Sequence, residues 1–223
     1  MNAIRTVFVM GGLLVTVSAP GTLSPARYRN GPIPSLPVLA VGIGGGQLFL
    51  ELAVSQSGSV AAVRPLRTTA GFTELTVGAV QMWEFVPAEE RVEPKTGATG
   101  PTTRRVDSKV LVVAMFRPPT LQTPTLGEPI RNVALASDET PLPVSTTMPP
   151  FPPLARNPGV VLVEARVDGL GMVVGVKVLR SAPPFDGVAR NAARQWKFRP
   201  SRIGGKPVTS FVYILFGFPV PLS

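Results

Sequence analysis

The sequence predicts an α+β fold made of two tandem small units. Each unit has the order strand, strand, helix, strand, with an antiparallel sheet packed on one helix. Two observations lead to this prediction. Residues 47–87 and 160–200 align without a gap at an offset of 113 positions, so the chain carries two copies of one unit. In each copy, two short runs typical of strands precede a helical apolar stripe, and a further apolar run follows it.

The repeat is carried by matched residues of several types. Glu51, Gly58, Leu66-Arg67, Phe72, Trp83, Phe85 and Pro87 of the first copy match Glu164, Gly171, Leu179-Arg180, Phe185, Trp196, Phe198 and Pro200 of the second. The chain has 223 residues, and each copy is near the lower size limit for an independent core. We therefore expect two small units rather than one large core.

The elements of the second copy follow from its sequence pattern. Residues 160–167 alternate between apolar and charged side chains, as expected for a half-buried strand. Residues 168–171 form a glycine-containing hairpin loop, and residues 173–180 form the returning strand. Two prolines open a helix over residues 183–196 with an apolar stripe. The last strand covers residues 208–218.

The first copy repeats this order less regularly. Strands are expected at residues 48–54, 60–66 and 109–116, and a helix at residues 72–83. A glycine and β-branched residues weaken that helix. A polar insertion at residues 88–108 has no counterpart of equal length in the second copy.

Composition divides the chain into five segments. Residues 1–26 resemble a signal peptide or short membrane anchor, because Arg5 is followed by an uncharged, mostly apolar run. Candidate cleavage sites follow Ala19 and Ala26. The other segments are a Pro/Gly linker (27–45), the first copy (46–117), a Pro-rich linker (118–150) and the second copy (151–223). We expect a periplasmic protein, tethered to the inner membrane if the leader is retained.

The residue inventory argues against catalysis. The chain has no cysteine and no histidine, which excludes a disulfide framework, a thiolate metal site and the commonest general base. We therefore expect neither an enzyme nor a cofactor or metal site. The net charge of +9 resides mainly in the second copy, where residues 151–223 hold ten Lys or Arg and three Asp or Glu. Nucleic acid is not an expected partner, because the aromatic residues occupy presumed core positions.

Several residues permit both a functional and a structural interpretation. Trp196 and Phe198 could be ligand platforms, but a small sheet-and-helix unit needs large core groups, so we favour core positions. Asp168 is better explained as a turn residue than as a base. Glu51 and Glu164 could form an acid and base pair, but no other catalytic residue type accompanies them, so we favour outward-facing strand positions.

Three segments of the second copy together carry a resemblance. They are Phe151-Pro152-Pro153-Leu154-Ala155-Arg156, then Asp168-Gly169-Leu170-Gly171 with the strand that follows it, then Asn191-Ala192-Ala193-Arg194-Gln195-Trp196-Lys197-Phe198-Arg199-Pro200. In this order and spacing they resemble the C-terminal domain of the TonB family. The first copy looks like a diverged second example.

The resemblance implies a binding role. TonB links inner-membrane energy to outer-membrane transporters by gripping a short peptide that adds to the edge of its sheet. The positions that match the peptide-binding segments are Phe151, Pro152, Val208, Thr209, Ser210, Phe211, Val212, Tyr213 and Ile214. The implied partners are an outer-membrane transporter peptide or another envelope protein, together with inner-membrane motor proteins. The chain has Pro150 where the family has Gln, and its leader lacks the family's coupling histidine. We therefore expect a binding module rather than a complete energy transducer.

Two further hypotheses follow from the second copy. The last strand is apolar on both faces, and so is the strand at residues 110–116 of the first copy. We therefore expect these two strands to contact each other, or a second protomer, in a pseudo-two-fold arrangement. The second hypothesis is a periplasmic adaptor whose basic helix face (Arg190, Arg194 and Lys197) holds an anionic envelope polymer or lipid. The simpler interpretation of that face is a solvated basic surface.

Overall fold

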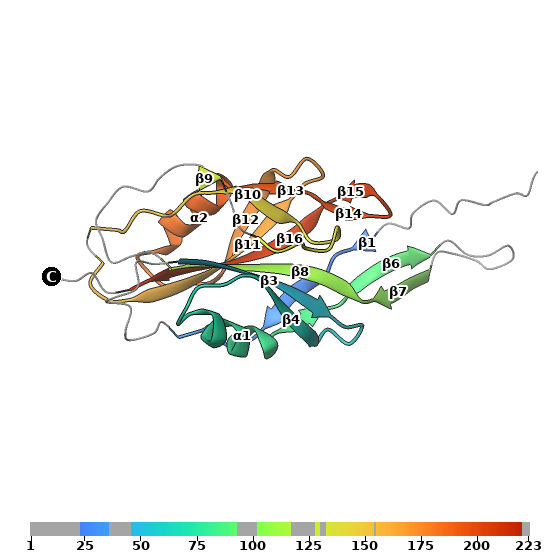
Figure 1. Cartoon of the computed structure of the whole chain (residues 1–223), viewed down its shortest axis with the longest axis horizontal. Helices are drawn as coiled ribbons and strands as arrows, with labels where there is room; N and C mark the ends of the chain where they lie inside the picture. Colours follow the sequence, from blue (N-terminus) through green and yellow to red (C-terminus); the bar gives the residue numbers. More distant parts are fainter. Residues whose placement is uncertain are drawn as a thin grey trace, which may run out of the picture.

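The computed structural model describes residues 23–35, 46–92, 102–116, 128–129, 133–153 and 155–219 (Figure 1). Residues 1–22 of the expected leader lie outside this set. The first repeat comprises β1 (Leu23–Ser24), β2 (Arg27–Asn30), β3 (Gly46–Val54), β4 (Val60–Arg67), α1 (Thr73–Gln81), β5 (Glu84–Val86), β6 (Ala88–Val92), β7 (Thr102–Val106) and β8 (Ser108–Phe116). The second comprises β9 (Glu128–Pro129), β10 (Leu142–Thr146), β11 (Gly159–Val167), β12 (Val173–Arg180), α2 (Asp186–Arg194), β13 (Lys197–Arg199), β14 (Ser201–Ile203), β15 (Lys206–Val208) and β16 (Ser210–Phe218).

One six-stranded sheet forms the centre of the molecule. Its order is β12-β11-β16-β8-β3-β4. From either edge inward, the strands are the second, the first and the last strand of one repeat. Pairing within each repeat is antiparallel, but β16 and β8 pair in parallel over Val212–Gly217 and Leu111–Phe116. The expectation that the two last strands contact each other is therefore confirmed. The two units do not keep separate sheets, because the apolar faces of β8 and β16 are buried only when the strands lie side by side.

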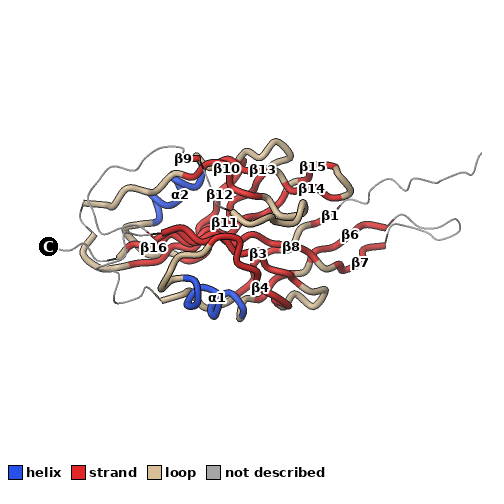
Figure 2. The backbone as a smooth tube through the Cα atoms, viewed as in Figure 1, coloured by secondary structure: helices blue, strands red, loops and turns tan. Residues whose placement is uncertain are grey.

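The two helices lie on opposite sides of this sheet (Figures 1 and 2). A parallel pairing of equivalent strands requires this, because a two-fold axis along the strands preserves their direction and exchanges the faces. Each face therefore has its own core. Alternate residues of β16 show the division, since Ile214 and Phe216 belong to the core under α2, while Tyr213 and Leu215 belong to the core under α1.

Large aromatic residues anchor both cores. Trp83 and Trp196 are almost fully buried, and each donates its indole N–H to a backbone carbonyl, of Pro32 at 2.8 Å and of Thr147 at 3.0 Å. A buried side chain of this size contributes about 3 kcal/mol or more to the free energy of unfolding. The interpretation of Trp196 and Phe198 as core residues is confirmed, since both are buried in the core under α2.

The second helix is shorter than expected. It begins at Asp186, whose carboxylate accepts the backbone N–H of Ala182 at 2.8 Å. The acidic residue in the first turn and Arg194 in the last turn both suit the helix dipole. The first helix is also shorter than the predicted range 72–83, and it lacks a basic residue in its last turn.

The boundaries of both expected linkers are wrong. In the range 27–45, β2 pairs with β5, and in the range 118–150, β10 pairs with β13. These leading segments supply the carbonyls of Pro32 and Thr147 that the two Trp residues bind, so they belong to the folded repeats. A leader ending at residue 26 would also include β1, which is paired with β6, and the buried Ala26.

The polar insertion also folds. Strands β6 and β7 form a hairpin with five paired positions, from Ala88 opposite Val106 to Val92 opposite Thr102. Its counterpart in the second repeat is the shorter hairpin of β14 and β15. Figure 1 shows the longer hairpin extending beyond the end of the sheet.

Candidate functional site

The strand expected to accept a peptide is not free. Residues Ser210 to Phe218 pair with β11 on one side, and Val212–Gly217 pair with β8 on the other. The expectation of an open edge is therefore wrong at Val212, Tyr213 and Ile214, whereas Ser210 and Phe211 pair with β11 alone. Val208 ends β15, where it pairs with Ser201, and Thr209 lies between β15 and β16. A peptide could pair with Val212–Gly217 of β16 only if β8 separated from it.

The aromatic-proline segment has a packing role in this structure. The ring of Phe151 lies 5.6 Å from the ring of Phe185 and 6.3 Å from that of Phe218, both measured between centroids. Phe151 and Pro152 are half-buried. This segment covers the α2 core at the end of β16.

The true edges of the sheet are β4 and β12, and they differ. On β4 the backbone carbonyl of Leu66 accepts the N–H of Ala134 at 2.8 Å. Beside β12, the bridge from Met172 to Lys197 involves only the residue that precedes the strand. Among the described residues, no backbone group bonds the outer side of β12 from Val174 to Leu179. The second repeat therefore presents a strand whose outer edge is unpaired, whereas the outer edge of the first repeat is partly covered.

The segment that covers the edge of β4, residues 134–140, is held by a buried carboxylate. Glu51 is 4 % exposed, and it accepts hydrogen bonds from Arg64 at 2.7 Å, from the Ser137 N–H at 2.9 Å and from the Thr140 hydroxyl at 2.6 Å. Burial acts to raise the pKa of Glu51, but the hydrogen bonds from Thr140, Arg64 and Ser137 outweigh it, so the pKa lies below its ordinary value. The ionised carboxylate thus holds residues 137–140 against the sheet.

The equivalent Glu164 lies on the opposite face and is 5 % exposed. Arg27 binds one of its oxygens at 2.6 Å, and the Tyr213 hydroxyl donates to the other at 3.3 Å. The Tyr213 oxygen in turn accepts the N–H of Tyr28 at 2.7 Å. Burial raises the pKa of Tyr213, and the negative charge of Glu164 acts in the same direction. Tyr213 therefore stays neutral and acts as a relay between the leading segment and the carboxylate.

The expectation that Glu51 and Glu164 face solvent is wrong, since both are buried. They also cannot form an acid and base pair, because each is held by its own cluster on its own face of the sheet. Sequence reasoning missed Arg27, Tyr28 and Thr140, the residues that complete these clusters. Their position in segments with a linker-like composition gave no sign of this role.

A trough lies beside the open strand, on the face that carries α1. We use this name for the hollow of about 240 Å³ lined by Arg27, Glu164, Arg166, Gly175, Val176, Lys177 and Phe211. The Arg27 guanidinium stacks 4.6 Å from the centroid of the Phe211 ring. A second hollow of about 520 Å³ continues from Arg27, Arg166 and Phe211 to Glu89 and Arg91 on β6. The surface next to β12 is therefore predominantly cationic with an aromatic floor.

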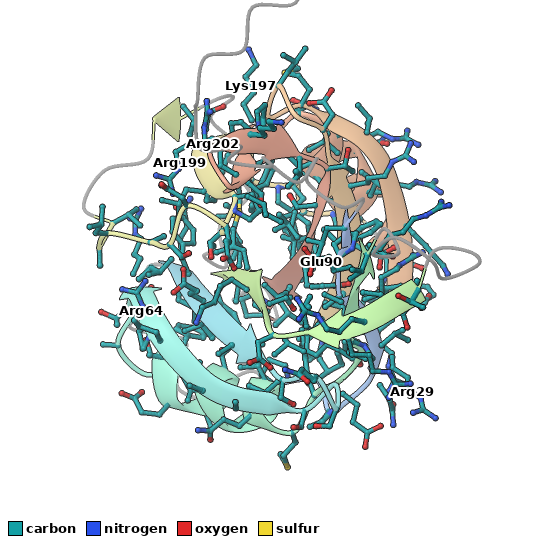
Figure 3. All side chains as sticks on the ribbon, turned by 90° about the vertical axis from the view of Figure 1, so that its right-hand side faces the viewer. Arg29, Arg64, Glu90, Lys197, Arg199 and Arg202 are labelled. Atoms are coloured by element: carbon teal, nitrogen blue, oxygen red, sulfur yellow. The ribbon has the colours of Figure 1, made fainter. Side chains whose placement is uncertain are left out.

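Basic side chains lie on both flanks of the molecule. Figure 3 views the molecule along the strands, with Arg64 and Arg199 on one flank and Arg29 on the other. Arg190, Arg194 and Lys197 of the expected basic helix face are all exposed. The interpretation of Asp168 as a turn residue is confirmed, since its carboxylate accepts the N–H groups of Leu170 and Met172, both at 2.9 Å.

The described residues contain no group of three or more acidic side chains placed to hold a metal ion. In the same part of the chain, neither helix has the length and apolar character needed to cross a membrane.

Comparison with protein families gives one finding for the second repeat. Residues 149–218 match the family described as Gram-negative bacterial TonB protein C-terminal. Comparison with curated proteins finds no match to the chain. The family match confirms the resemblance found in the sequence, and it covers β11, β12, α2 and all of β16.

Proposed function

We propose that this chain is a TonB-like protein of the periplasm that binds an extended segment of an outer-membrane transporter or another envelope protein. The family match of residues 149–218 supports a TonB-like envelope protein, and this family binds transporters. Binding takes place by strand addition at the outer edge of β12, and not at β16. The function is that of a binding module with no catalytic step.

One observation carries the proposal, namely the absence of a backbone partner on the outer side of Val174 to Leu179 within the described residues. An unpaired edge presents N–H and C=O groups to which an extended peptide can bond with little demand on its sequence. Each such bond contributes about 1 kcal/mol net, so a short peptide forms a weak and reversible complex. Reversibility suits a protein that couples transiently to its partners.

The closed state of β16 supports the choice of β12. Opening β16 would break its parallel pairing with β8 over six positions and expose Tyr213 and Leu215, both fully buried. Exposing two such side chains costs about 3–6 kcal/mol before any peptide bond forms. The edge at β12 needs no such rearrangement.

Nuclear magnetic resonance tests this proposal on the whole chain labelled with ¹⁵N. The probe is a TonB-box heptapeptide from an outer-membrane transporter, added to millimolar concentration. We expect amide shifts concentrated in Val173–Arg180. Because an added strand uses only alternate amides, N-methylation of one alternate set of peptide amides should abolish binding, and methylation of the other set should preserve it. Shifts confined to β16, no shifts at all, or equal tolerance of both methylated peptides would overturn the proposal.

A further inference from the structure

The first repeat contains an example of an extended segment docked on this fold. Residues 133–140 cross the β4 edge and lie on the face of the sheet that carries α2. The Ala134 N–H bonds the strand carbonyl of Leu66, Arg64 donates to the carbonyl of Leu135 at 2.8 Å, and Ser137 and Thr140 donate to Glu51. The docked segment is therefore held by one backbone hydrogen bond to the strand edge, one basic side chain that donates to a backbone carbonyl, and one buried carboxylate that accepts two hydrogen bonds.

The second repeat has corresponding groups, and its equivalent leading segment contacts only one of them, since Arg27 corresponds to Thr140 and binds Glu164. At the offset of 113 positions, Leu66 corresponds to Leu179, and Arg64 corresponds to Lys177. Glu51 corresponds to Glu164, which faces Lys177 across the strands just as Glu51 faces Arg64. Among the described residues, however, Glu164 is bound by Arg27 instead, and Lys177 has no ion-pair partner. The basic group of the docking site is therefore left free.

The charge beside the uncovered edge of β12 differs from that beside β4 in the first repeat. Glu51 accepts hydrogen bonds from its docked segment, but Glu164 is already paired with Arg27 and accepts the Tyr213 hydroxyl. Arg166, whose counterpart in the first repeat is Ala53, adds a second exposed cation to the trough. An incoming segment would therefore meet free cations and no free buried carboxylate.

We propose that β12 and the trough bind an extended acidic segment, with the carboxylates of alternate residues directed at Lys177 and Arg166. This inference rests on the proposed strand addition and names the chemistry of the partner. The aromatic floor at Phe211 accommodates the aliphatic stems of those side chains. Charge disfavours a second copy of the chain as the occupant, because antiparallel pairing of two β12 strands would bring Lys177 and Arg180 of one copy against the same cations of the other.

The experiment uses the whole chain and three blocked heptapeptides in which valine alternates with glutamate, glutamine or lysine. Calorimetry at low salt gives the affinities, and ¹⁵N shifts give the site. We expect the glutamate peptide to bind about tenfold or more tightly than the glutamine peptide, and the lysine peptide to bind weakest. The double variant Arg166→Gln with Lys177→Gln should remove the glutamate advantage. Arg27 is left intact, because its loss would leave Glu164 buried and unpaired.

A matched control removes the same charge elsewhere. Arg190→Gln with Arg194→Gln takes two exposed cations from α2 and should leave the affinity of the glutamate peptide within about twofold. Equal affinity for the glutamate and glutamine peptides, with shifts still at β12, would overturn the acidic preference and leave strand addition standing. Loss of binding in the control pair would show general attraction of anions and overturn the inference. Absence of shifts along β12 with every peptide would overturn the proposed function as well.

Discussion

Glu51 and Glu164 occupy equivalent positions on opposite faces of one sheet, and each is bound by the leading segment of the other repeat. Ser137 and Thr140, which lead into the second repeat, bind Glu51 of the first, while Arg27, which leads into the first repeat, binds Glu164 of the second. This reciprocal exchange, together with the pairing of β8 with β16, joins the two repeats into one cooperative unit.

Replacing Glu51 by Ala should destabilise the whole chain. The substitution leaves the Ser137 N–H and the Thr140 hydroxyl without their acceptor and Arg64 without its partner, at a cost of about 2–4 kcal/mol. Urea unfolding followed by circular dichroism measures this loss. The control is Glu90→Ala, which breaks only the exposed pair with Arg104 and should cost less than about 1 kcal/mol. Equal losses in the two variants would show that the Glu51 cluster contributes no more than a surface pair.

The contribution of Glu51 should depend on pH. Its folded pKa lies below the ordinary value of 4.5, so the unfolded state takes up the proton first as the pH falls. The stabilisation is therefore fully present above pH 4.5 and is lost progressively below it. Urea unfolding of the wild-type chain and of Glu51→Gln at several pH values should show a stability difference that narrows through this acidic range. A difference that widened on acidification would contradict the lowered pKa.

Substitutions at Tyr213 should separate its hydroxyl from its ring. Tyr213→Phe removes the acceptor of the Tyr28 N–H and a donor to Glu164, so we expect a loss of about 1–2 kcal/mol with the fold retained. Tyr213→Asp places a second carboxylate beside Glu164 in a fully buried position and should lower the melting temperature far more. Scanning calorimetry compares the two. An unchanged melting temperature for Tyr213→Asp would mean that this face of β16 is exposed.

Alanine substitutions at two glycines of the second repeat should have opposite effects on stability. Gly171 has a φ of +81°, and an added Cβ would lie 1.8 Å from the carbonyl oxygen of Phe198. Gly171→Ala should therefore destabilise by more than about 1 kcal/mol. Gly187, in α2, has no atom within 4 Å of an added Cβ, so Gly187→Ala should stabilise by about 0.5 kcal/mol. Thermal unfolding of both variants checks the contrast, and a stabilising Gly171→Ala would contradict the close approach.

The second repeat produced alone should self-associate. Without the first repeat, residues 133–223 would expose Leu162, Tyr213 and Leu215, which are fully buried in the core under α1. Sedimentation velocity should show dimers or larger species for this fragment and a monomer for the whole chain. A monomeric, stable fragment would show that β16 can remain an open edge, and would revive it as a peptide site.

Most of the central sheet follows from the sequence, because the alternation of β11 and β12 and the internal repeat are strong local signals. The parallel pairing of β8 with β16 was foreseen only as a contact, from their two apolar faces. Its consequence for the site was missed. An edge strand and a central strand differ in what lies beside them, and that depends on residues about a hundred positions away.

The leading segments could not be recognised as folded. Their proline content is typical of a linker, and their strands are short, as in β2 and β10. They are ordered by contacts with the Trp residues and the buried glutamates of distant elements. No local pattern encodes such contacts, so composition alone misplaced the boundaries.

The parallel seam at the middle of the sheet has a consequence for how the protein is made. The strand at Ser108–Phe116 is complete long before its neighbour at Ser210–Phe218 has left the ribosome or the export channel. Until then its apolar surface has no cover, and the nascent chain is prone to aggregate. A holding chaperone should therefore matter more for the yield of this protein than for a chain in which each repeat completes its own core.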